Sequence, residues 1–144
     1  MRRFAAAALG LAILALAPSA SATIKPARGM SGISLGMTPA QVQAKLGRPV
    51  VKSGAKWYYP TLHVTFRARR VAELTTTKKA ERLSNGLGIH SSEGQLQTAF
   101  PQIRCAVWTI FRRCRLGSGA PGSRVTDFML ARGRVFQITI ARLP

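Results

Sequence analysis

The chain has 144 residues, and its 22 lysines and arginines stand against only four aspartates and glutamates, giving a net charge of +18. This length suits one ordinary domain, or two very small units that share a core, and excludes a large multidomain enzyme. Four carboxylates and two histidines leave few groups for acid–base catalysis, whereas the charge favours anionic partners.

The first 22 residues have the three parts of a secretion signal. Two arginines precede an uncharged apolar run of 14 residues, and Ala20-Ser21-Ala22 then matches the small-x-small cleavage pattern. We therefore expect cleavage between Ala22 and Thr23, which leaves 122 residues and a net charge of +16. The alternative is a membrane anchor, but 14 helical residues are too short for a hydrocarbon core of about 30 Å. The expected product is soluble, and is secreted or retained in the periplasm or cell envelope.

Residues 23–31 are expected to form a flexible leader, because Pro26 and Gly29 interrupt them. An internal repeat begins at Gly32. Residues 32–47 align with residues 86–101 at a constant offset of 54, with few identities but matching physical roles.

Each copy of the repeat predicts one short helix of about nine residues. Thr38 with Gln41, and Ser92 with Gln95, have the spacing of a capping box. Helices this short do not persist alone in water, so each must pack on another element. The residues that would form the packed stripe are two i, i+4 pairs, Val42 with Leu46 and Leu96 with Phe100.

Each predicted helix is followed by a predicted hairpin. Residues 62–66 and 71–75 alternate apolar and polar side chains, and residues 128–130 and 135–140 match them at an offset of 64. In the first copy, residues 50–51 and 57–59 are expected to add further strands. The predicted fold is α+β. It has two tandem units, residues 32–84 and 85–144, each a short helix on a small antiparallel sheet, joined into one domain.

Cys105 and Cys114 remain after export. An even pair outside the cytoplasm favours a disulfide, although the eight residues between them include no glycine, proline, asparagine or aspartate to mark the turn. A metal site is not expected, because two thiols without a nearby histidine or carboxylate cannot complete four ligands.

The pattern resembles a known family. Gly32-x-x-x-Gly36-Met37-Thr38-x-x-Gln41-Val42-x-x-x-Leu46-Gly47-x-Pro49, followed by Trp57-Tyr58-Tyr59-Pro60 and Leu62-x-Val64-x-Phe66, resembles the SmpA/OmlA (BamE-like) group of envelope proteins. Two such units in tandem are similar to the beta-lactamase inhibitor protein-like superfamily. The resemblance implies a non-enzymatic protein that either assists outer-membrane protein assembly or binds secreted enzymes with the face of a joined sheet.

No catalytic, cofactor-binding or metal-binding residues are predicted. His63 and His90 have no partner at metal spacing, the four carboxylates are not closely paired in the sequence, and no nucleophile elbow or phosphate loop is present. A secreted nuclease or hydrolase is therefore the weakest hypothesis.

The candidate partner-binding residues combine aromatic rings with cations, a composition found at interface hot spots. For Trp57 the alternative is core packing, and for the arginines it is a solvated sheet edge.

The favoured hypothesis is an exported binding module whose sheet face contacts an unidentified extracytoplasmic protein. The alternative is an electrostatic binder of an anionic envelope polymer or lipid surface, and nucleic acid is not an expected partner in vivo. The candidate residues are Trp57, Tyr58, Trp108, Phe111, Arg112 and Arg113.

Overall fold

The computed structural model describes residues 23–144, so the predicted secretion signal, residues 1–22, lies outside the described residues. In chain order, the helices and strands are β1 (Ile24–Lys25), β2 (Gly29–Met30), β3 (Ile33–Ser34), α1 (Pro39–Leu46), β4 (Val51–Ser53), β5 (Lys56–Tyr58), β6 (Leu62–Arg67), β7 (Arg70–Thr76), α2 (Glu93–Ala99), β8 (Arg104–Trp108), β9 (Phe111–Leu116), β10 (Arg124–Ala131) and β11 (Arg134–Arg142).

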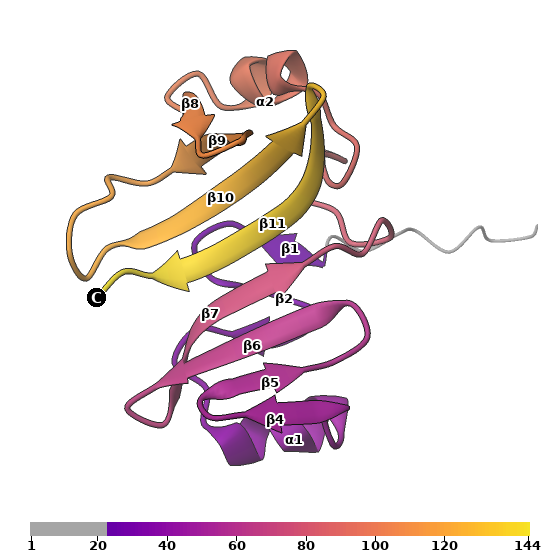
Figure 1. Cartoon of the computed structure of the whole chain (residues 1–144), viewed down its shortest axis with the longest axis vertical. Coiled ribbons are helices and arrows are strands. Elements are labelled where there is room, and N and C mark those ends of the chain that lie inside the picture. The colour runs from indigo at the N-terminus through magenta and orange to yellow at the C-terminus, as the bar shows by residue number, and fades with distance from the viewer. Residues whose placement is uncertain (1–22) are drawn as a thin grey trace, which may run out of the picture.

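Eight of the strands form one antiparallel sheet in the order β4-β5-β6-β7-β11-β10-β9-β8. β7 and β11 pair at its middle, so β4 and β8 are its edges. Figure 1 shows α1 beside the β4 edge and α2 beside the β8 edge. The strands β1, β2 and β3 form a small sheet of their own. The fold is therefore α+β, as the sequence predicts.

The same order of elements occurs twice along the chain, since α1 precedes β4–β7 and α2 precedes β8–β11. The inner hairpins also share local details at an offset of 64. The strand register shifts after Thr65 in one hairpin and after Met129 in the other. Both hairpins turn through two residues of positive φ, namely Ala68 and Arg69 in the first and Arg132 and Gly133 in the second.

Both predicted capping boxes are formed. Thr38 Oγ1 accepts from the Gln41 amide at 3.2 Å while Gln41 Oε1 accepts from the Thr38 amide at 2.9 Å. Ser92 and Gln95 repeat this exchange at 3.1 and 2.8 Å. Each helix therefore begins at the residue that the sequence predicts.

One core joins the helices and both sheets. Val42 of α1 and Leu96 of α2 are fully buried, and they belong to the same apolar cluster as the inward residues of the large sheet. Ile24, Met30 and Ile33 of the small sheet are about 1% exposed and complete this cluster.

The structure differs here from the predicted flexible leader over residues 23–31. Pro26 occupies a turn closed by the Arg28 amide on the Lys25 carbonyl, at 3.0 Å, with Ala27 at a φ of 58°. The Ala27 amide donates to Thr126 Oγ1 at 2.8 Å, which ties the turn to β10. Pro26 and Gly29 therefore mark a tight reversal between strands rather than a mobile segment.

Because β7 and β11 pair and the core is continuous, we expect the two halves to unfold together. Trp57 lies in the first half and Trp108 in the second. Each of the variants Trp57→Phe and Trp108→Phe therefore keeps a single tryptophan, and the two remaining tryptophans report on opposite sides of the β7–β11 pair. In urea, each variant should give the same midpoint by fluorescence as by far-UV circular dichroism. Different midpoints within either variant would show that the halves unfold separately.

The buried N-terminal segment gives a second prediction. Ile24→Ala should lower the free energy of unfolding by about 2–4 kcal/mol, because it leaves a cavity in the core. Lys25→Ala, at the neighbouring exposed position, should change it by less than about 0.5 kcal/mol. Urea unfolding monitored by circular dichroism measures both, and equal small effects would mean that the segment does not contribute to the core.

Candidate binding surface

The large sheet has one buried face and one open face. Inward residues such as Val64 and Leu74 are fully buried, whereas the residues that alternate with them, such as His63 and Thr75, are exposed or half-buried. Since both helices and the small sheet contribute to the core on the buried face, they leave the other face uncovered.

The β8–β9 hairpin forms one edge of this sheet, and a disulfide crosses it. Cys105 and Cys114 are directly paired residues of the two strands and are bonded, as predicted. The missing turn marker is explained by Thr109, which adopts a φ of 55° in the two-residue turn between Trp108 and Phe111. A β-branched residue rarely adopts this conformation, so the sequence carries no turn signal there.

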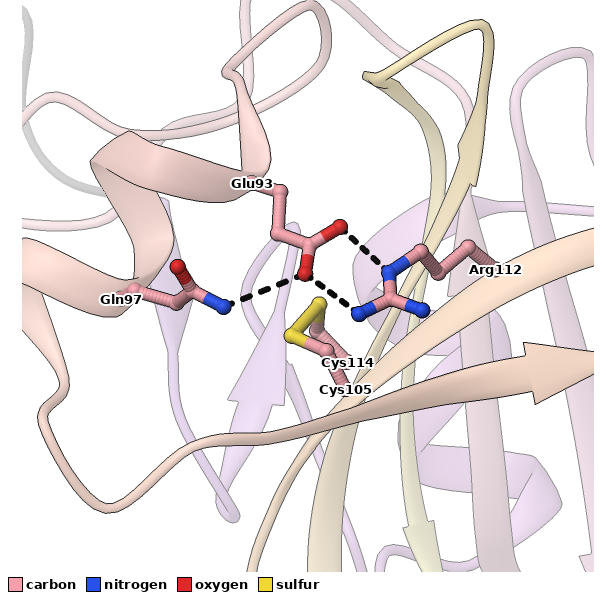
Figure 2. Close-up of polar contacts among 5 residues, drawn as sticks. All are labelled: Glu93, Gln97, Cys105, Arg112 and Cys114. Carbon is pink, nitrogen blue, oxygen red and sulfur yellow. Dashed lines mark hydrogen bonds and ion pairs between the residues drawn. A yellow bond between two sulfur atoms is a disulfide. The ribbon is translucent and has the colours of Figure 1, made fainter.

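Arg112 is held by α2 rather than left free. Its Nε and Nη2 atoms donate to the Glu93 carboxylate at 2.5 and 2.8 Å, and Gln97 Nε2 donates to the same carboxylate at 3.1 Å (Figure 2). Hydrogen bonds to Glu93, and then its negative charge, raise the pKa of Arg112. The predicted contact residue Arg112 thus links the hairpin to α2, next to the disulfide.

An aromatic and cationic patch, with one exposed and three half-buried side chains, lies on the open face between this edge and β11. We call Trp108, Phe111, Arg113 and Phe136 the hairpin patch. Trp108 is 50% exposed, and the Arg113 guanidinium lies 3.9 Å from the centroid of its ring. The rings of Phe111 and Phe136 lie 4.9 Å apart between centroids. Exposed rings stacked with an arginine are typical of binding hot spots.

The sequence did not single out Phe136. It lies at the register shift of β11, where two successive apolar residues, Val135 and Phe136, interrupt the alternation. Such a break in the period of two signals a bulge, which turns the extra side chain toward the open face.

Trp57 and Tyr58 lie away from the hairpin patch, because β5 and β9 are separated by four strands of the sheet. Trp57 is only 9% exposed, and its ring packs against Phe66 with 4.8 Å between centroids. Trp57 therefore packs in the core, as the alternative interpretation expected, and its burial does not support the prediction that it contacts a partner. Tyr58 is half-buried beside His63, with 4.8 Å between ring centroids.

A second ion pair lies on the open face. Arg115 donates to Asp127 through Nε at 2.7 Å and Nη2 at 2.6 Å. The hydrogen bond to Asp127 raises the pKa of Arg115, while partial burial acts in the opposite direction. This bidentate pair fixes both side chains between the hairpin patch and the middle of the sheet.

A cavity of about 450 Å³ lies on the first half of the chain, beside Glu81. Tyr59, Thr61 and Lys78 also line it. Glu81 is 3% exposed, and its Oε2 atom has no hydrogen-bond partner among the described residues. Burial raises the pKa of Glu81, while hydrogen bonding to Thr76 and the charge of Lys78 act in the opposite direction.

Comparisons with known proteins show the fold alone. No protein-family model matches the sequence, and no curated protein matches it. The structure is similar to that of an extracellular protein containing an SCP domain from Bacillus anthracis str. Ames, with a TM-score of 0.55 and 9% identity over 75% of this chain. The chain spans 44% of that protein.

A second similar structure is that of a DUF4309 family protein, YjgB, from Bacillus subtilis subsp. subtilis str. 168. Its TM-score is 0.55, with 11% identity, and the match covers 78% of this chain and 84% of that one. The structure and the comparisons thus define this chain as an α+β protein with an eight-stranded antiparallel sheet. Within residues 23–144, no helix has the length and apolar character needed to cross a bilayer.

Glu81 gives a pH-dependent prediction. The pKa of Glu81 is raised in the folded state. Below the unfolded-state pKa near 4.5 the carboxyl is protonated in both states, so no charge is buried. As the pH rises through the folded-state pKa, the charge forms in the core and stability is lost. A difference of one between the pKa values of the folded and unfolded states corresponds to about 1.4 kcal/mol of stability. Glu81→Gln should therefore be more stable than the wild type at pH 7.5, with the gain shrinking toward pH 4.

Thermal unfolding at a series of pH values measures this difference. Glu73→Gln, at a half-buried position of β7, is the matched control and should show no such gain. A gain from Glu81→Gln that does not depend on pH would contradict the explanation based on burial of the charge.

Proposed function

We propose that the protein is an exported, non-enzymatic binding module that contacts an extracytoplasmic partner protein through the open face of its sheet. The hairpin patch carries this proposal, because it places the exposed Trp108 ring in contact with the half-buried Arg113 on a face that the helices leave uncovered. The net charge of +16 expected after cleavage favours a partner with an acidic surface.

The rigidity of the hairpin supports the same function. The disulfide crosses β8 and β9, and the ion pair from Arg112 to Glu93 attaches β9 to α2. A patch fixed in this way loses little conformational freedom when a partner binds, so more of the contact energy appears as affinity. Export supports it as well, because a disulfide persists in an oxidising compartment, and one similar structure is described as an extracellular protein.

The repeated order of elements favours a tandem duplication of units 32–84 and 85–144. The capping boxes recur at an offset of 54, and the register shifts and hairpin turns recur at 64. This arrangement is what the resemblance to the SmpA/OmlA group and the beta-lactamase inhibitor protein-like superfamily implies, and in that superfamily the face of a joined sheet can serve as a binding surface.

A second candidate function is electrostatic binding to an anionic polymer or lipid of the envelope. It is favoured by the excess of 20 basic over four acidic side chains in residues 23–144. Binding of this kind weakens steeply between about 50 and 200 mM salt, because it depends on counterion release. Binding through the hairpin patch depends less on salt.

The partner hypothesis is tested by capture of protein from native envelope or culture supernatant in 150 mM NaCl. Trp108→Ala/Arg113→Ala should weaken saturable binding at least tenfold, because truncation of hot-spot residues typically costs about 2 kcal/mol or more. Val50→Ala/Lys45→Ala is the matched control, since it also removes one exposed apolar and one cationic side chain. Equal binding by both double variants would exclude the hairpin patch, and loss of all binding at 200 mM NaCl would favour the electrostatic candidate.

A further inference from the structure

Four arginines surround a cavity at the opposite end of the sheet from the hairpin patch. The cavity has a volume of about 370 Å³ and lies where the β6–β7 turn meets the start of β10 and the end of β11. Figure 1 shows that end of β11 near the C-terminus, on the same side of the sheet as the turn between β6 and β7. We call this the arginine cavity, and its charged lining residues are Arg67, Arg70, Arg124 and Arg142.

The arginines form two like-charged cross-strand pairs. Arg67 lies directly opposite Arg70, and Arg124 lies directly opposite Arg142. Like charges in this position destabilise a sheet. All four side chains are exposed, so solvent and salt screen part of this repulsion, and a bound anion would remove what remains.

No carboxylate neutralises these side chains. Within residues 23–144, the ion pairs are Arg112–Glu93 and Arg115–Asp127, and in both the arginine belongs to β9. None of the four acidic side chains of that segment lines the cavity, including Glu73, which is next in the chain to the lining residue Ala72. The four arginines thus line a cavity to which no acidic side chain of residues 23–144 contributes.

Two of the guanidinium groups are held in place. Arg67 Nη2 donates to the Arg142 carbonyl at 2.9 Å, and Arg70 Nη1 donates to the Gly36 carbonyl at 3.2 Å. Each of these bonds uses one nitrogen and leaves other N–H groups available. The floor is apolar and buried, formed by Leu35, Val71 and Ala72.

We propose that the arginine cavity is a binding site for the phosphate group of a phosphate ester. Guanidinium groups match phosphate oxygens in bidentate geometry, and several of them together neutralise a doubly charged group. The volume suits a phosphate with a small organic substituent, whose apolar part can contact the floor. This proposal deepens the second candidate function by naming its ligand chemistry and place, and it does not depend on the hairpin patch.

The test uses Arg124→Gln/Arg142→Gln, because these side chains make no hydrogen bond within the described part of the chain. Arg48→Gln/Arg104→Gln is the matched control, since it removes the same charge from exposed positions outside the cavity. Calorimetric titration in 150 mM NaCl with glycerol 3-phosphate and with inorganic phosphate should show saturable binding by the wild type and the control. The cavity variant should bind at least tenfold more weakly.

Vesicles of phosphatidylglycerol, compared with phosphatidylcholine, identify the source of the phosphate. If only the cavity variant loses binding to phosphatidylglycerol, the site is supported and its ligand is a lipid headgroup. If the protein binds glycerol 3-phosphate but not the vesicles, the site is supported and its ligand is a soluble or polymeric phosphate ester. Equal losses in the two double variants would overturn the proposal while leaving general electrostatic binding intact. Absence of saturable binding to every probe would overturn it as well.

Discussion

The antiparallel pairing of β7 and β11 is the constraint on which the rest of the structure depends. It joins the two four-stranded halves into one sheet, and Thr75 and Thr139 share a hydrogen bond of 3.0 Å between their hydroxyl groups at its middle. Without it, each half would expose an unpaired strand and would bury only the small core of a marginally stable domain. The core side chains Leu74, Ile138 and Ile140 lie on the buried side of the same joint.

The register of this joint relates the halves to one another. Thr75 and Thr139, which face each other, are also equivalent positions at the offset of 64, so the pairs on either side of them are arranged symmetrically. Features that break this symmetry therefore stand out. The second half has the longer outer hairpin, the disulfide and the hairpin patch, whereas β4 and β5 have three residues each. A symmetric scaffold accounts for the fold, and the asymmetric hairpin accounts for the candidate binding surface.

The elements that depend on local chemistry could be predicted from the sequence, and those that depend on distant contacts could not. The capping boxes at Thr38 and Ser92 need only residues three apart, and the hairpin turn at Gly133 needs only one glycine. The N-terminal segment escaped prediction because Ile24 gains its partners from elements far along the chain. Trp57 and Trp108 have similar local surroundings in sequence, and only the assembled sheet buries one and exposes the other. The arginine cavity unites residues 67 and 142, which no local pattern could connect.

The few acidic residues polarise the molecule. Glu93 and Asp127 both neutralise arginines of β9, close to the hairpin patch, while Glu81 is buried on the first half. The aromatic end of the sheet is therefore partly neutralised, whereas Arg124 and Arg142 make no ion pair among residues 23–144, with Glu73 on the neighbouring strand β7 as the nearest acidic position in the register. Since desolvation of an unpaired cation opposes protein–protein contact, neutralisation at the hairpin favours a protein interface there. The same reasoning assigns the unpaired arginines to a ligand that brings its own negative charge, so one small basic protein can present two chemically different surfaces.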